Sequence, residues 1–305
     1  MAADQMNSQT EKGARFARSH LEPGIIVLPN AWDVGSAVMM AEAGFSAIAT
    51  TSAGIAFALG FPDGQRISRD RMLESVAQIV AAVAVPVTAD LEAGYGPRPE
   101  DVASTVRGAL NVGAVGCNIE DSSDNADSPL FEIELACDRI RAGAEAARSS
   151  NVAFVLNARV DPYLVCPGSD AANFTETVKR ANAYRAAGAD CLFILGPMDG
   201  ETIGRLVREI DGPLNVLGAR GGVSSSLSVS DLERLGVKRV SLGGSLATAA
   251  FGCVQRALRE LHESGTFTYA RTALSHSEVN ALMAKYRAWR STAMRNLTPP
   301  LWAES

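Results

Sequence analysis

Short apolar segments recur along this chain, and a stretch with helical periodicity separates each one from the next. Eight such segments cover residues 25–29, 46–50, 85–90, 115–120, 153–159, 191–195, 213–218 and 238–243. Uninterrupted apolar runs of this length are typical of strands that are buried on both faces of a parallel sheet. Amphipathic stretches lie between them at 33–42, 69–82, 99–111, 133–148, 174–187 and 200–209, and 245–262 follows the last. The alternation predicts parallel strands joined by helical crossovers.

The glycines between these units and the number of units support a closed barrel. The segments AEAGF, NVGAVG, AAGAD and ERLGVKR each place a glycine where a helix is expected to end before the next strand. Eight strand–helix units predict one α/β domain over residues 1–305 with a (β/α)8 TIM-type barrel core at 25–262. An N-terminal segment precedes the core, and an extension at 263–305, with a helix expected at about 277–295, follows it. A doubly wound open sheet is the alternative, but no GxGxxG follows the first strand.

Charge and cysteine usage exclude several classes of protein. The chain has 28 basic and 34 acidic residues, a net charge of −6, and no basic run, so we expect no nucleic-acid partner. The five cysteines are widely spaced without a CxxC, which argues against a disulfide framework or a zinc site. The polar N-terminus is unlike a secretory signal, and no apolar stretch is long enough for a membrane helix. We therefore predict a cytoplasmic protein without a membrane partner.

Acidic residues gather where the predicted strands end. The third strand ends at Asp90, and Glu92 lies two residues on, so both side chains would project to one side of an extended chain. The fourth strand ends at Glu120, the fifth ends at Arg159, and the loop after the second contains Asp63. Catalytic groups of such barrels come from the C-terminal ends of the strands. We expect these side chains to meet at one mouth of the barrel.

Carboxylates that share one mouth repel each other unless a cation lies among them. Mg²⁺ is the expected cation, because it takes oxygen ligands and typically binds one or two carboxylates together with the substrate; Mn²⁺ would also fit. Arg159 would clamp a carboxylate or phosphonate. This combination suits a small 2-oxo acid whose enolate the metal stabilises. The same spacing also allows a structural alternative, in which Asp90 and Glu120 pair with Arg159 in an ion network.

Four motifs follow one another in an order that resembles a known superfamily. They are TTSAGIAFALGFPDG, ADLEAGYG, NIED and NARVD, and the likeness covers roughly residues 25–262. The resemblance is to the isocitrate lyase/phosphoenolpyruvate mutase superfamily. It implies an α/β barrel that assembles as a homo-oligomer, a dimer or tetramer, in which neighbouring subunits exchange the C-terminal helical region.

The resemblance also implies roles for residues in the motifs. Asp90 becomes the direct Mg²⁺ ligand, and Asp63, Glu92 and Glu120 hold the metal through water. Arg159 binds the anionic end of a small carboxylate substrate and acts in catalysis with Tyr95 and Asp63. The implied substrate-binding residues around them are Thr51, Ser52, Ala53 and Gly96. Specificity is expected from the loops after strands four to seven, including Asn215.

The loop after the fourth strand departs from the superfamily. Lyases carry KKCGH there, with the cysteine as acid/base, whereas this chain has DSSDNADSPLFE without Cys, Lys or His. Cleavage of isocitrate or methylisocitrate by the usual route is therefore not expected. The mutase and phosphonopyruvate hydrolase branches keep a lysine and an asparagine on this loop. In this chain only the asparagine has a counterpart, which is Asn125. Ser122, Ser123, Asp124 and Asn125 are expected to cover the site when this gating loop closes.

Together these features predict a Mg²⁺-dependent lyase that cleaves a C–C bond of a small 2-oxo or 2-hydroxy carboxylate. Retro-aldol/Claisen cleavage or decarboxylation would proceed through a metal-stabilised enolate. The first alternative is C–P chemistry of the phosphoenolpyruvate mutase or phosphonopyruvate hydrolase type. The second is a phosphosugar or flavin enzyme, because GARGGVSSS and LGGSL lie where barrels often bind phosphate. The third is a protein that binds a 2-oxo acid with little turnover.

Overall fold

A single parallel sheet closes into a barrel in the computed structural model, which describes residues 8–123, 125–197, 199–220, 223–224 and 226–284. Its strands are β1 Ile26–Leu28, β2 Asn30–Ala31, β3 Ile48–Thr50, β4 Val87–Asp90, β5 Gly116–Glu120, β6 Val155–Val160, β7 Cys191–Ile194, β8 Leu214–Leu217 and β11 Arg239–Ser241. Only Pro29, which has no N–H for the ladder, separates β1 from β2. Because β1 pairs with β11 and β2 pairs with β3, these two form one barrel strand that closes the ring.

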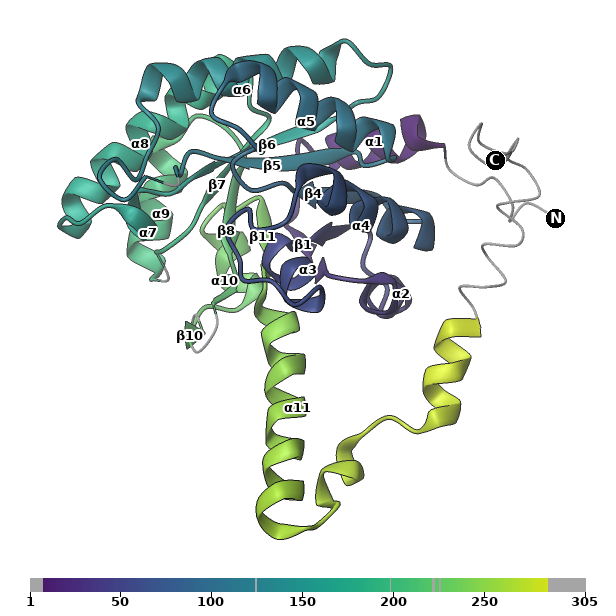
Figure 1. Ribbon diagram of the computed structural model, residues 1–305. Helices are drawn as coiled ribbons and strands as arrows, with labels where there is room; N and C mark the ends of the chain where they lie inside the picture. Colours follow the sequence, from purple (N-terminus) through teal and green to yellow (C-terminus); the bar gives the residue numbers. More distant parts are fainter. Residues whose placement is uncertain (1–7, 124, 198, 221–222, 225, 285–305) are drawn as a thin grey trace.

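Helices surround this ring (Figure 1). They are α2 Val34–Glu42, α4 Arg69–Ala82, α5 Pro99–Asn111, α6 Ile133–Arg148, α8 Asp170–Ala187, α9 Gly200–Glu209 and α10 Val229–Arg234. Each predicted strand overlaps an observed one, with β6 ending one residue later than predicted, and α4, α5, α6 and α9 begin and end at the predicted residues. The predicted TIM-type barrel is confirmed, and the open-sheet alternative is excluded. Elements that were not expected are α1 Gln9–Ser19, α3 Ser52–Ala58, α7 Pro162–Val165, the 3₁₀ helix η1 Thr268–Thr272 and the hairpin β9 Ala219–Arg220 with β10 Val223–Ser224. Of α10, only the end before Gly236 was predicted.

The glycines predicted to end helices all have left-handed backbones. Their φ angles are 89° for Gly44, 89° for Gly113, 112° for Gly188 and 91° for Gly236. A side chain with a Cβ is strained at such angles, and glycine is not. These four positions therefore confirm the prediction of where each helix gives way to the next strand.

Helix α1 covers the N-terminal end of the barrel. Phe16 of this helix is 2% exposed and packs with Ile26 of β1, Val155 of β6 and Cys191 of β7. One turn later, the Nδ1 atom of His20 lies 2.8 Å from the carbonyl oxygen of Phe16. The N-terminal segment is thus part of the barrel core, at the end opposite the predicted catalytic mouth.

His20 is expected to make the protein less stable in mild acid. Burial, reinforced by the charge of Arg239, lowers the pKa of His20 from 6.5 to about 4. Between these values the unfolded chain binds a proton that the folded chain does not, so stability falls as the pH falls, by at most about 3 kcal/mol. Urea unfolding of the wild type and of His20→Gln at pH 7.5 and 4.5 measures this effect. The stability of the wild type relative to the variant should drop at the lower pH, and an unchanged difference would contradict the assignment.

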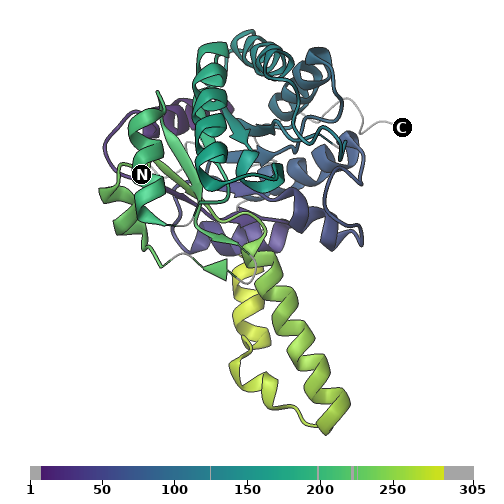
Figure 2. The same cartoon turned by 90° about the vertical axis from the view of Figure 1, so that its left-hand side faces the viewer.

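The last barrel helix projects away from the ring instead of packing on it. In two perpendicular views α11, Ser245–Ser264, extends from the barrel as a stalk (Figures 1 and 2). Its apolar side chains are exposed, among them Phe251 at 47%, Val254 at 57% and Leu258 at 60%. Residues 276–284 form a further helix, and the rest of the helix expected at 277–295 lies outside the described residues. Within the described part of the chain no helix, α11 included, is long and apolar enough to cross a membrane.

Candidate active site

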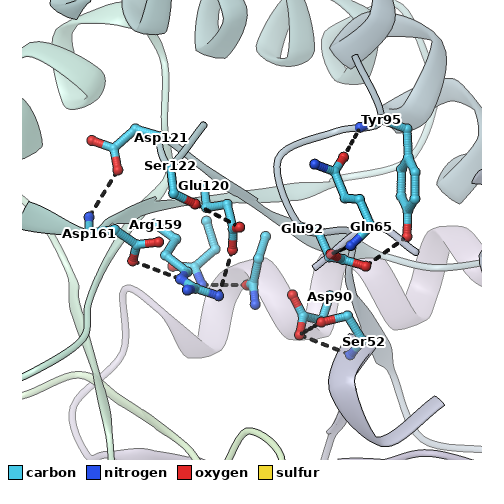
Figure 3. Close-up of polar contacts among 12 residues, drawn as sticks. Ser52, Gln65, Asp90, Glu92, Tyr95, Glu120, Asp121, Ser122, Arg159 and Asp161 are labelled. Carbon is cyan, nitrogen blue, oxygen red and sulfur yellow. Dashed lines mark hydrogen bonds and ion pairs between the residues drawn. The ribbon is translucent and has the colours of Figure 1, made fainter. Parts of the chain in front are cut away.

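The C-terminal end of β4 places the carboxylate of Asp90 at the mouth of the barrel, and one of its two oxygen atoms has no hydrogen-bond partner. Asp90 Oδ2 accepts hydrogen bonds from the backbone N–H of Ser52, at 3.0 Å, and from its hydroxyl, at 2.8 Å (Figure 3). The Asp90 backbone N–H donates to the hydroxyl of Thr50 at 2.9 Å. Asp90 Oδ1 is buried without a hydrogen-bond partner. A buried carboxylate oxygen without a donor is a suitable cation ligand.

Glu92 reaches the same mouth by a different backbone path from the expected one. Its φ of 52° shows that the chain turns after Asp90, so the extended alternation assumed from the sequence ends there. Glu92 accepts hydrogen bonds from the backbone N–H of Gln65 and, at 3.3 Å, from the hydroxyl of Tyr95. Burial and the nearby charges of Asp90 and Asp63 raise the pKa of Glu92 to about 7. The carboxylates are thus close enough to repel one another.

Asp63 belongs to the same group of acidic side chains. Burial, followed by the charge of Asp90, raises the pKa of Asp63. Among the described residues, however, no three acidic, histidine or cysteine side chains converge closely enough to ligate one ion directly. The donor set fits Mg²⁺ held directly by Asp90 and through water by its neighbours, since Mg²⁺ usually keeps several waters.

Arg159, at the end of β6, is held between two carboxylates. Its Nη1 lies 2.6 Å from Glu120 Oε2, and its Nε lies 2.8 Å from Asp161 Oδ1. The hydroxyl of Ser122 donates to the other Glu120 oxygen at 2.8 Å. The charges of Asp161 and Glu120 raise the pKa of Arg159 despite the opposing effect of burial. Part of the ion network suggested by the sequence therefore exists, but no ion pair of the described residues joins Arg159 to Asp90.

A buried cluster that the sequence did not point to fixes Asp161. Asp121 Oδ1 accepts from the backbone N–H of Asp161 at 2.9 Å. Asp121 Oδ2 accepts from the Tyr184 hydroxyl at 2.7 Å and from Arg180 Nη1 at 3.3 Å. Arg180 and Tyr184 come from α8, and only their i, i+4 spacing in the sequence links them. The cluster fixes Asp161, which in turn orients Arg159.

The other predicted substrate-binding residues lie in three places. Thr51 caps α3, where its hydroxyl accepts from the Gly54 N–H at 3.2 Å, and Ala53 follows within this helix beside Ser52. Gly96 lies beyond Tyr95 in the loop after β4. Asn215 lies in β8 and not in a loop, and its buried side chain donates to the Ser241 hydroxyl at 3.1 Å. The structure therefore joins Ser52, which Thr51 and Ala53 flank in the chain, to Asp90 and places Asn215 inside the barrel.

The predicted gating loop folds back on itself. Ser122 forms an antiparallel bridge with Leu130, and the backbone N–H of Ser123 donates to the carbonyl of Pro129 at 2.8 Å. Asn125 is exposed, and Asp124 lies outside the described residues. In the Gly/Ser-rich segment after β8, residues 221, 222 and 225 also lie outside them, and β9 pairs with β10 as an antiparallel hairpin. The described part of the gating loop is thus a short hairpin whose first serine bonds to the site through Glu120.

Comparisons with known proteins identify the family and agree with the barrel fold. The family model described as phosphoenolpyruvate phosphomutase matches residues 16–262. A Corynebacterium glutamicum protein named "Probable 2-methylisocitrate lyase 1" is 30% identical over 259 residues, 82% of either chain. A crystal structure from Burkholderia cenocepacia J2315, described provisionally as a lyase/mutase, has a TM-score of 0.85 and 43% identity, and the match covers 90% of this chain and 96% of the other.

The structure of 2,3-dimethylmalate lyase, a superfamily member, supports the fold, with a TM-score of 0.80, 24% identity and coverage of 93% of this chain and 99% of that chain. The family model spans most of the chain, including every strand of the barrel. The relatives are lyases or mutases. The chain therefore belongs to the phosphoenolpyruvate phosphomutase family and is an enzyme of the isocitrate lyase/phosphoenolpyruvate mutase superfamily.

Proposed function

We propose that the protein is a Mg²⁺-dependent lyase that cleaves a C–C bond of a small 2-oxo or 2-hydroxy carboxylate. The observation that carries this proposal is Asp90 Oδ1, a buried oxygen without a partner, at the mouth that also holds Arg159. A cation ligand and an anion clamp at one mouth suit an acid whose carboxylate and 2-oxygen must both be bound. Asp63, Glu92 and Glu120 are the groups that would hold the waters of the metal.

Each residue has a part in this reaction. When bound, Mg²⁺ (or Mn²⁺) supplies positive charge that stabilises the enolate oxygen left by C–C cleavage. Arg159 binds the substrate carboxylate; its pairs with Glu120 and Asp161 use Nη1 and Nε, which leaves Nη2 outside them. Thr51, Ser52 and Ala53 line the carboxylate side. Tyr95, hydrogen-bonded to Glu92, and Asp63 carry the proton transfers, because the gating loop has no cysteine for them.

C–P chemistry is the second candidate, and the family itself supports it. The Arabidopsis thaliana carboxyvinyl-carboxyphosphonate phosphorylmutase is 25% identical over 291 residues, 92% of this chain and 84% of that protein. The same cation and arginine would serve a phosphonate. The gating loop lacks the lysine of this branch as well as the cysteine of the lyases, so the products must decide between the two candidates.

A product screen separates the two candidates. Purified protein with Mg²⁺, and an EDTA-treated control, is incubated with 2-hydroxy, 2-oxo and phosphono acids while pyruvate, glyoxylate, CO₂ and phosphate are measured. EDTA-sensitive release of a carbon fragment supports the lyase. Release of phosphate or formation of phosphonopyruvate moves the protein to the C–P branch. Mg²⁺-dependent binding of a 2-oxo acid without any product would overturn the enzymatic assignment.

We also propose that the protein is cytoplasmic and that it is a homo-oligomer, a dimer or tetramer, in which subunits exchange the C-terminal helical region that α11 leads into. The exposed apolar stripe of this helix supports the exchange, because burial against a second subunit would remove it from water. Light scattering should give a mass of two or four chains, and Leu258→Glu should shift it towards one chain. A monomeric wild type would contradict the exchange.

A further inference from the structure

A large cavity lies beside the candidate active site. Its volume is about 930 Å³, at the upper end of the range of about 300–1,000 Å³ that holds ligands of drug size. A substrate with only three or four carbons would leave most of this space unused. The cavity is bordered by the loop after α3, the loop after β4 and the gating loop.

The cavity and the acidic site share a wall. Gln65, Tyr95 and Ser122 line the cavity. The first two donate hydrogen bonds to Glu92, and Ser122 donates to Glu120 (Figure 3). A molecule bound beside these carboxylates therefore has the cavity immediately next to it.

One buried side chain behind the lining, Arg139 of α6, is 1% exposed and contacts three of the residues that line the cavity. Arg139 Nη1 donates to the carbonyl of Gly96 at 2.6 Å, and Nη2 donates to the carbonyl of Ala93. Its guanidinium carbon lies 4.0 Å from the ring centroid of Phe131. Ala93, Gly96 and Phe131 all line the cavity. A single helix thus ties the loop after β4 to the end of the gating loop, so these parts of the wall are preformed.

The lining indicates what the cavity would accept. Ile67, Ala93, Pro97 and Phe131 supply apolar surface, and the uncharged polar side chains of the lining are Gln65, Ser68, Ser122, Ser123 and Asn125. The charged residues among the described lining are one cation, Arg69, and two carboxylates, Asp70 and Asp101. The lining therefore does not attract a second anionic group, and its apolar part favours hydrocarbon.

We propose that this cavity receives an uncharged, mostly apolar substituent of several carbons, carried by the 2-oxo or 2-hydroxy acid on the side away from Arg159. This inference rests on the proposed function, because it requires the acid to bind at the neighbouring site. It makes the substrate a longer-chain or aryl-substituted acid. Arg139 becomes a positioning residue that holds the walls of the cavity and does not touch the reacting atoms.

Calorimetric titration with oxalate and N-alkyl oxamates, all in Mg²⁺, tests the proposal without requiring turnover. Each methylene that enters the cavity should tighten binding by up to about fourfold. We expect N-hexyl oxamate to bind at least about thirtyfold more tightly than N-methyl oxamate, and N-carboxymethyl oxamate to bind more weakly than N-propyl oxamate. Phe131→Ala should reduce the hexyl-to-methyl ratio at least about fivefold, while Phe267→Ala, on the exposed C-terminal segment, should leave it unchanged.

The outcomes distinguish failure of the substituent cavity from failure of the proposed function. Equal Kd values along the alkyl series, with normal oxalate binding, would overturn the substituent cavity and leave the proposed function standing. A preference for the charged oxamate would overturn the stated substrate class. Failure of oxalate and of every oxamate to bind would overturn the proposed function and the cavity with it.

Discussion

Asp90→Asn is expected to reduce kcat/KM by at least about a thousandfold, because an electrostatic contact with a reacting centre is worth several kcal/mol. The substitution keeps the size of the side chain but removes its charge. The backbone N–H of Ser52 must still meet an oxygen, so the new amide NH₂ takes the place of Oδ1 and points where the cation would bind. Steady-state rates over a range of Mg²⁺ concentrations measure the loss.

Asp33→Asn is the matched control for this variant. Asp33 caps α2 by accepting from the Ser36 N–H at 2.7 Å, and asparagine caps helices about equally well. This variant should keep the activity of the wild type and the same circular dichroism spectrum. If Asp90→Asn folds and turns over substrate at the wild-type rate, Asp90 is not the ligand.

Arg159→Lys is expected to reduce kcat/KM by about a hundredfold or more, although the positive charge is retained. A lysine ammonium is a point charge and cannot reproduce the planar fork that binds Glu120, Asp161 and a substrate carboxylate together. Most of the loss should appear in KM for the carboxylate. Wild-type KM and kcat in a folded variant would contradict the role of Arg159 as an anion clamp.

Arg159→Met separates binding from structure. Removing the cation leaves the buried carboxylates of Glu120 and Asp161 without their partner, and breaking such a pair costs about 3 kcal/mol. Urea unfolding should show this loss, whereas Arg159→Lys should retain more stability. Equal stability of the two variants would show that the network contributes little to folding.

The barrel could be predicted from sequence because its strands are short, apolar and separated by helices that end at glycines. Gly188, for instance, ends α8 in a left-handed conformation, three residues before the start of β7. The carboxylates at the strand ends could be found for the same reason: in a parallel barrel, chain direction alone brings the C-terminal ends of the strands to one mouth.

Features that depend on loops or on contacts between distant helices could not be predicted. Glu92 turns in a left-handed conformation that non-glycine residues seldom adopt, so strand alternation did not describe it. Gln65 donates to Glu92 through its backbone N–H, which any residue supplies, and its side-chain oxygen accepts from the Tyr95 N–H at 2.8 Å across two loops. In the sequence, Arg139 is one of several polar residues in an amphipathic stretch. In the structure its side chain is buried and donates a hydrogen bond to the loop after β4.

Oxalate titration of EDTA-treated protein, with and without added Mg²⁺, tests directly whether the mouth of the barrel is a metal-dependent 2-oxo acid site. Oxalate resembles the enolate of a 2-oxo acid and needs both the cation at Asp90 and the clamp at Arg159. We expect tight oxalate binding only with Mg²⁺, at one oxalate per chain, and no oxalate binding in Asp90→Asn. Equal oxalate affinity with and without the metal would contradict a metal-dependent 2-oxo acid site.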